Sequence, residues 1–138
     1  MTSKRTHIQY KDAKALKSAG WRVEGKRCIR LHTNPQDETI AHAHAKASVG
    51  KVLAEAGYCV DSEVEHESGC VADIVAFGLE GRKPIVVELE SEYSDELKQR
   101  NLKKYQHGPV AEVWTLPVDE FGNNIEHMQT YAKAKLGL

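Results

Sequence analysis

Two apolar runs joined by a short polar connection constrain the fold of this chain more than any other feature. The first run is VADIVAF (residues 71–77) and the second is IVVELE (residues 85–90), and GLEGRKP lies between them. Apolar runs of this length, bounded by Gly and Pro, are typical of buried β-strands, and a short connection joins antiparallel neighbours. The sequence therefore predicts a β-hairpin in the protein core.

Three carboxylates fall within this predicted hairpin. Asp73 interrupts the first run, and burying a carboxylate is costly unless it is paired, hydrogen-bonded or bound to a metal. Glu88 and Glu90 are two residues apart, so they share one face of the second strand, although like charges repel. With the turn near residues 80–82, antiparallel pairing places Asp73 opposite a residue between Glu88 and Glu90. We therefore expect the three carboxylates to converge.

Two interpretations of these carboxylates are open. Oxygen ligands with high negative charge suit a hard cation, and Mg²⁺ in particular is held by one or two carboxylates together with water and substrate phosphate. Alternatively, Glu88 and Glu90 form the solvated end of a strand, and Asp73 caps a nearby turn of the backbone.

Regular patterns continue on both sides of the hairpin. Helices are predicted over residues 36–56, 94–106 and 123–136, and strands over residues 58–67 and 110–118. The strand over 58–67 alternates, and we expect it to be half-buried. One side would hold Val60, Ser62, Val64 and His66, and the other Asp61, Glu63, Glu65 and Glu67. The order is helix, three strands, helix, strand, helix, which predicts an α/β protein.

The N-terminal third has a different charge from the rest of the chain. Residues 1–34 have a net charge of +7 and the remainder −8. A helix over residues 11–19 and a hairpin about residues 24–26 are predicted there. Asn34-Pro35 is the candidate boundary, because the residue before a proline is biased away from helix. We therefore expect a basic helix-hairpin appendage over residues 1–34 and a main domain over residues 35–138. The appendage favours an anionic partner, with nucleic acid first and an acidic lipid surface or the protein's own body as competitors, although a solvated basic segment explains it equally well.

Several classes of protein are disfavoured. Three cysteines without a C-x-x-C pair argue against a disulfide framework or a zinc ribbon and favour a reducing, cytoplasmic compartment. No apolar run approaches the roughly 20 residues of a membrane span. The motifs of serine hydrolases, P-loop NTPases and zincins are absent from the sequence.

The order of elements, with Asp73 on the second strand and Glu88 on the third, resembles the PD-(D/E)xK nuclease-like superfamily. The resemblance covers about residues 38–118, and EVEHESGCVADIVAF with PIVVELES is similar to small nuclease-like proteins of archaeal mobile elements and viruses. It implies a restriction-endonuclease-like αβββαβ core with a mixed central sheet flanked by helices. Ala72 stands where the signature has proline, and Glu90 where it has lysine; some members carry Glu-x-Glu.

The resemblance implies a Mg²⁺- or Mn²⁺-dependent DNA endonuclease that hydrolyses phosphodiester bonds. Asp73 and Glu88 would bind the ion, and Glu90 would bind a second ion or orient and deprotonate the attacking water. Glu38 is the candidate for a further acid, with Glu55 second and Glu63 and Glu65 also possible. Lys98 is the candidate cation in place of the missing lysine, and Asn101 and Tyr105 share its helix face. His44 is the histidine more able to face the site, although His42 and His44 both suit surface or packing positions.

The implied partner is DNA, with a homodimer expected by analogy with nucleases of this size. The expected phosphate contacts are Lys14, Lys17, Arg22, Lys26, Arg27, Arg30, Lys103 and Lys104. Because Glu90 occupies the lysine position, two alternatives stay open: a catalytically inactive DNA-binding or assembly module with the same fold, and a protein-interaction domain without a nucleic-acid role.

Overall fold

The computed structural model describes residues 4–23, 29–30 and 39–138, and within them the chain is an α/β protein. Five strands form one mixed sheet in the order β1-β2-β3-β4-β5, with β1–β2 and β4–β5 parallel and the other neighbours antiparallel. The elements are α1 (Lys4–Ser18), β1 (Ile29–Arg30), α2 (Ile40–Glu55), β2 (Cys59–Glu65), β3 (Val71–Phe77), β4 (Ile85–Glu90), α3 (Asp95–Tyr105), β5 (Glu112–Pro117), the 3-10 helix η1 (Val118–Phe121) and α4 (Ile125–Leu136).

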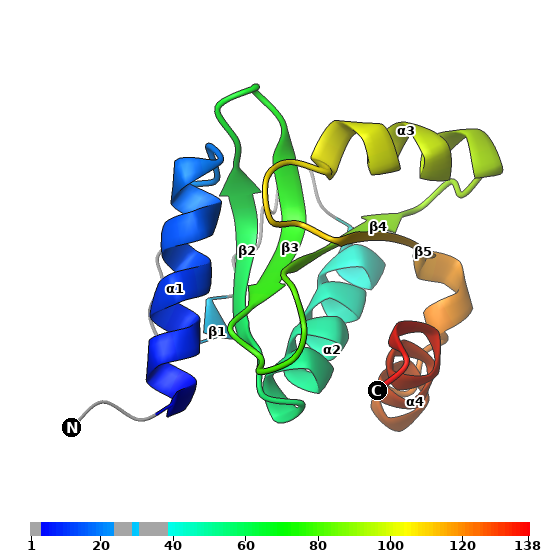
Figure 1. Ribbon diagram of the computed structural model, residues 1–138. Coiled ribbons are helices and arrows are strands. Elements are labelled where there is room, and N and C mark those ends of the chain that lie inside the picture. Colours follow the sequence, from blue (N-terminus) through cyan, green and yellow to red (C-terminus); the bar gives the residue numbers. More distant parts are fainter. Residues whose placement is uncertain (1–3, 24–28, 31–38) are drawn as a thin grey trace.

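Helices cover both faces of the sheet, which gives three layers (Figure 1). The face under α2 and α4 is packed with residues such as Val49, Ile74 and Val87. The opposite face packs against α1 and the end of α3, where Leu16 and Tyr105 join Val75. No helix in the described part of the chain is both long enough and apolar enough to cross a lipid bilayer.

The main-domain elements follow the predicted order, and their ends have local causes. Thr39, Ser94 and Asn124 precede α2, α3 and α4, and each accepts a hydrogen bond from a backbone amide in the first helical turn. Such capping satisfies amides that have no partner within the helix. The strand predicted over residues 85–90 has those bounds in the structure.

The N-terminal helix is longer than predicted and packs on the sheet. The sequence predicts a helix over residues 11–19, whereas α1 runs from Lys4 to Ser18. Leu16 and Trp21 are buried in the same apolar cluster as the sheet residues, and the Asp12 carboxylate accepts the Gly78 amide at 2.9 Å. The turn predicted about residues 24–26 and the boundary at residue 34 lie outside the described residues. Ile29–Arg30 pairs in parallel with β2.

Regular alternation in β2 was a wrong prediction. Val60 and Val64 belong to clusters on opposite faces of the sheet, and Asp61, expected on the solvated side, is buried. The alternation breaks at Glu63, whose φ of +50° lies in the left-handed region. For a residue with a side chain that conformation costs about 1 to 3 kcal/mol, so the surrounding structure must enforce it.

The pairing of β3 with β4 differs by one residue from the prediction. Ile74 pairs with Val87, so the register brings Asp73 beside Glu88, not opposite a residue between the two glutamates. The pairing ends there, while β2–β3 pairing continues to Glu65 and Val71 and β4–β5 pairing to Glu90 and Pro117. The sheet therefore forks between β3 and β4, and Figure 1 shows the two strand pairs diverging.

We expect α1 to unfold together with the sheet. Leu16→Ala removes a fully buried side chain and should lower the free energy of unfolding by about 2 to 5 kcal/mol. Tyr10→Ala on the same helix is the control, because Tyr10 is exposed and should change stability little. Urea denaturation followed by circular dichroism measures both. A Leu16→Ala protein as stable as the Tyr10→Ala protein would show that α1 is a separate appendage.

Candidate functional site

A buried pair of carboxyl groups lies at the fork between β3 and β4. Glu88 is 5% exposed, and the Asp73 side chain is 15% exposed. The Asp73 amide donates to Glu88 Oε1 at 3.3 Å, and the Leu89 amide donates to Asp73 Oδ2 at 2.8 Å. The two side chains thus bind backbone amides just beyond the last strand pair, where the ladder of the sheet has ended.

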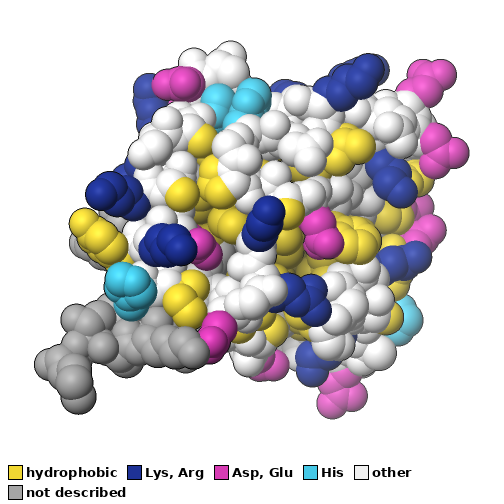
Figure 2. Space-filling model, viewed as in Figure 1, with side chains coloured by type: hydrophobic (Ala, Val, Ile, Leu, Met, Phe, Trp, Pro, Cys, Tyr) yellow, Lys and Arg dark blue, Asp and Glu magenta, His cyan; other side chains and the backbone are white. Residues whose placement is uncertain are grey.

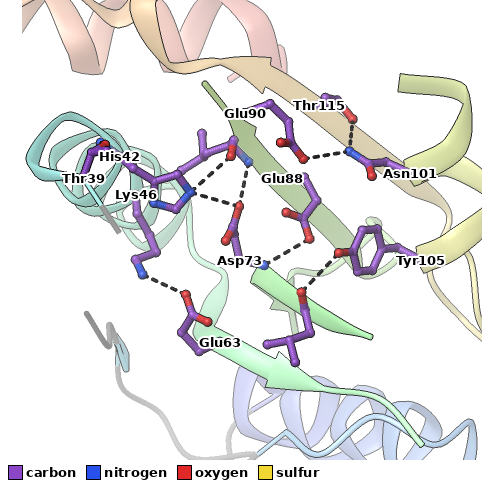
Figure 3. A network of polar contacts seen from close by, with 12 residues as sticks. Thr39, His42, Lys46, Glu63, Asp73, Glu88, Glu90, Asn101, Tyr105 and Thr115 are labelled. Carbon is purple, nitrogen blue, oxygen red and sulfur yellow. Dashed lines mark hydrogen bonds and ion pairs between the residues drawn. The ribbon is translucent and has the colours of Figure 1, made fainter. Parts of the chain in front are cut away.

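Two backbone carbonyls at the fork are bound in a similar way (Figure 3). His42 Nε2 lies 3.1 Å from the Leu89 carbonyl oxygen, and the Tyr105 hydroxyl donates to the Val71 carbonyl at 3.1 Å. A buried polar backbone group without a partner is costly, so side chains must replace the missing strand contacts. His42 comes from α2 and Tyr105 from α3, so helices on opposite faces of the sheet meet at this opening.

The two carboxyl groups differ strongly in acidity. Burial and then the neighbouring Asp73 charge raise the pKa of Glu88 to about 10. Burial also raises the pKa of Asp73, but hydrogen bonds with His42, Glu88 and the Leu89 amide outweigh it, so that pKa is below its ordinary value. Two carboxylates this close and this buried cannot both ionise cheaply. At neutral pH the pair therefore holds one proton, which resides on Glu88.

Glu90 has a hydrogen-bond partner of its own on α3. Its Oε1 accepts a hydrogen bond from Asn101 Nδ2 at 3.3 Å, and the same Asn101 nitrogen donates to Thr115 Oγ1 at 3.1 Å. Glu90 is partly exposed, while Asn101 and Thr115 are buried. The expected convergence of three carboxylates stays a prediction in its third member: Asp73 is in contact with Glu88, and Glu90 is bound to Asn101 of α3.

A buried lysine lies on the other side of Asp73. Lys46 is 1% exposed, and its Nζ is 3.0 Å from Glu63 Oε1. His42, one helical turn earlier on α2, is 3.4 Å from Asp73 Oδ2. Glu63 lies between the paired residues Ser62 and Val64, across from Asp73 on β3. Glu63, whose backbone is in the left-handed conformation, therefore lies beside the positive charge that Lys46 of α2 places near the fork.

The remaining predicted site residues are more dispersed. Lys98 is exposed and lines a groove along β5 with Leu102 and Trp114, and Glu55 and Glu65 are exposed. Arg22 is bound to Glu65 at 2.6 Å. Lys14, Lys17, Lys103 and Lys104 are exposed on α1 and α3, where phosphate could reach them. Lys26, Arg27, Glu38 and the side chain of Arg30 lie outside the described residues.

Sequence reasoning missed His42 and Lys46 as parts of the site and assigned His44, which is exposed, the better chance of facing it. A signal was present: His42 and Lys46 are four residues apart, so they share a face of a helix. Thr115 gave no signal, because a threonine in a strand is ordinary. The contact of Thr115 with Asn101 depends on α3 folding back over β5.

The donor set fits a hard divalent cation. Asp73 and Glu88 offer adjacent carboxylate oxygens, and Mg²⁺ takes one or two such ligands together with water and phosphate. A bound cation would also remove the like-charge repulsion that keeps Glu88 protonated. Comparison of the chain with protein-family models, with curated proteins and with solved structures found no match.

The shared proton predicts an unusual effect of Glu88→Gln. Between about pH 4.5 and 10 the unfolded chain has lost the Glu88 proton and the folded protein retains it, so this group destabilises the fold increasingly as pH rises. Gln resembles the protonated acid and keeps its hydrogen bonds. At pH 8 the variant should therefore be more stable than the wild type, by about 1 kcal/mol or more, which is about 4 °C in Tm.

Thermal unfolding of both proteins at pH 5 and pH 8, without divalent ions, measures this effect. The advantage of the variant should shrink at pH 5. Glu92→Gln is the control, because Glu92 is exposed just beyond β4 and should give no pH-dependent gain. A Glu88→Gln protein less stable than the wild type at pH 8 would contradict the shared proton.

Proposed function

We propose that this chain is a metal-dependent DNA endonuclease with a restriction-endonuclease-like core of the PD-(D/E)xK type. One observation carries the proposal: Asp73 and Glu88 form a buried carboxyl pair in which the pKa of Glu88 is raised to about 10. Such a pair destabilises the fold at neutral pH, and perturbed carboxyl groups of this kind concentrate at functional sites. The αβββαβ order of the main-domain elements supports the proposal.

Asp73 and Glu88 would hold Mg²⁺ or Mn²⁺. When bound, the ion supplies positive charge to the phosphate and to the leaving oxygen. The Leu89 amide and His42 keep Asp73 ionised and oriented. Glu90, fixed by Asn101 and partly exposed, is placed to orient the attacking water and accept its proton.

Lys46 is the cation that we favour in place of the signature lysine. Lys46 is almost fully buried beside Glu63, on the β2 side of Asp73. Because little water surrounds it, the electrostatic effect of its positive charge is weakly screened. Lys98, the candidate from the sequence, is exposed on the groove along β5. A buried lysine that is held by a strained glutamate suits a fixed electrostatic role.

DNA binding would use the exposed lysines of α1 and α3. Figure 2 shows that Lys and Arg side chains on the viewed face are interspersed with acidic ones, so phosphate contacts would be distributed over the surface. Such contacts give salt-dependent binding without sequence preference. Cutting both strands would require a two-fold symmetric pair of active sites, so we also propose a homodimer on DNA.

A second candidate function is a catalytically inactive DNA-binding or assembly module. The observation that favours it is that Asp73 and Glu88 already bind the backbone amides of Leu89 and Asp73. On this account the carboxyl pair only provides hydrogen-bond acceptors for backbone amides at the fork, and it performs no chemistry. The two functions differ in their response to divalent ions and to substitutions that preserve shape.

DNA cleavage separates the two functions. We expect the wild-type protein to cut supercoiled plasmid or branched DNA with Mg²⁺ or Mn²⁺ and not with EDTA. Asp73→Asn and Glu88→Gln preserve shape and should lower the cleavage rate about 100-fold or more, because each removes charge from the ion's ligands. Glu92→Gln should cut like the wild type. Gel assays of initial rates measure this, and circular dichroism checks folding.

Each result of the cleavage assay supports or contradicts one of the two functions. Cleavage that survives in Asp73→Asn, or that proceeds in EDTA, would contradict the assigned site. Salt-dependent DNA binding without cleavage of either substrate would support the inactive module. A Glu88→Gln protein that is more stable than the wild type and inactive would support the nuclease, because a purely structural residue does not trade stability for activity.

Replacing Lys46 tests the proposed cation. Lys46→Met should reduce cleavage about 100-fold, because it removes a fixed positive charge from the site. Glu63, which is 31% exposed, can be hydrated when its partner is lost, so we expect the variant to fold. Lys51→Met is the matched control, since Lys51 is exposed on the same helix. A folded Lys46→Met protein with the wild-type rate would remove Lys46 from the site.

A further inference from the structure

A second cluster of potential ligands lies at the tip of the β2–β3 hairpin. The ligand atoms of His66, Cys70 and His107 all lie within 4.8 Å of one another. His66 and Cys70 are buried on either side of the hairpin turn, where the His66 amide donates to the Cys70 carbonyl at 2.9 Å. His107 is partly exposed and follows the end of α3. None of the three residues belongs to the carboxyl pair at the fork.

We propose that His66, Cys70 and His107 form a binding site for Zn²⁺. Two imidazole nitrogens and one thiolate are borderline-to-soft ligands, which suit Zn²⁺ and not Mg²⁺. Zinc takes four ligands in a tetrahedron, and the partly exposed position of His107 leaves room for water as the fourth. The sequence carries no signal of this site, because His107 is distant along the chain and no C-x-x-C pair marks it.

The surroundings of His66 resemble those of a metal ligand. Its Nε2 lies 2.7 Å from the Ala19 carbonyl oxygen, so this nitrogen carries the hydrogen, and the electron pair is on Nδ1, where it accepts from the Ser68 amide. A backbone carbonyl that accepts from the second ring nitrogen is a common way to fix a histidine ligand. Nδ1 faces the turn, where the Ser68 amide and hydroxyl lie at 3.0 and 2.8 Å.

The Ser68 hydroxyl has an alternative acceptor when zinc takes the His66 Nδ1 electron pair. Zinc binds cysteine as the thiolate, so binding releases the Cys70 proton to solvent. The resulting negative sulfur is 3.4 Å from the Ser68 hydroxyl. The hydroxyl can therefore turn from the imidazole to the sulfur and keep an acceptor.

Binding requires one adjustment of the aromatic rings. The His66 and His107 rings are stacked with centroids 3.9 Å apart and an angle of 10° between their planes. An ion bound in the plane of both rings needs those planes to tilt apart. His107 can supply this tilt, because it is partly exposed and directly precedes Gly108 and Pro109, while His66 is fixed by Ala19.

The proposed ion would connect three parts of the fold. His66 is bound to the residue that follows α1, and the Trp21 indole donates to the His107 carbonyl at 3.3 Å. His107 lies two residues after the end of α3, whose Asn101 and Tyr105 contact the fork. Zinc would thus clamp the end of α1, the hairpin tip and the end of α3 together, and it should raise the Tm of the protein.

Co²⁺ titration of the purified full-length protein tests the site, because Co²⁺ replaces zinc and reports its ligands. We expect a thiolate-to-cobalt absorption band that saturates at one ion per chain and that added Zn²⁺ removes. Cys70→Ala should abolish the band, and His107→Ala should weaken binding and remove the increase in Tm on adding Zn²⁺. Cys59→Ala is the matched control, because Cys59 is also buried and lies in β2.

The outcomes are distinct from those for the carboxyl pair. Asp73→Asn should keep the cobalt band, so the proposal of a zinc site is tested independently of the proposed nuclease activity. The absence of a thiolate band in the wild type, or a band that survives in Cys70→Ala, would overturn the proposal. If Cys70→Ala does not fold, His107→Ala decides: unchanged Co²⁺ affinity and an unchanged Tm increase with Zn²⁺ would equally overturn it.

Discussion

The fork between β3 and β4 is the constraint on which the rest of the candidate site depends. Strand pairing stops at Ile74 and Val87, and the backbone groups beyond it must find other partners. Asp73 and Glu88 bind the freed amides, while His42 and Tyr105 bind the carbonyls of Leu89 and Val71. Polar side chains are therefore stable in the middle of an apolar sheet only because the sheet opens there.

The same opening brings the two helical layers together. In a continuous sheet, side chains from α2 and α3 would be separated by the strands. At the fork, α2 supplies His42 and Lys46, and α3 supplies Asn101 and Tyr105, to a region spanning β2 to β5 (Figure 3). Groups of opposite charge and groups that donate hydrogen bonds thus surround one carboxyl pair.

The electrostatics of the fork oppose the stability of the fold. A protonated Glu88 beside an ionised Asp73, and a left-handed Glu63 beside a buried Lys46, both store free energy that an apolar arrangement would not. Local features that oppose the fold tend to mark functional sites. We attribute them to the cation and phosphate that the proposed nuclease would bind.

The amino-acid sequence by itself determined the α/β class, the order of the main-domain elements and the proximity of Asp73 and Glu88. These depend on local signals: apolar runs of strand length, capping residues, and carboxylates inside an apolar segment. The sequence also indicated Asn101 and Tyr105 through their spacing on one helix face. Its errors included a β3–β4 register shifted by one residue, a regular alternation in β2 and an N-terminal helix that was too short.

Only the tertiary structure decided which side chains meet. Asn101 binds both Glu90 and Thr115 because α3 folds over β5, and Lys46 reaches the fork because α2 crosses the opposite face. His66, Cys70 and His107 come together through the packing of a hairpin tip against the end of α3. Such contacts join residues far apart in the chain, and no local pattern encodes them, because they follow from how whole elements pack.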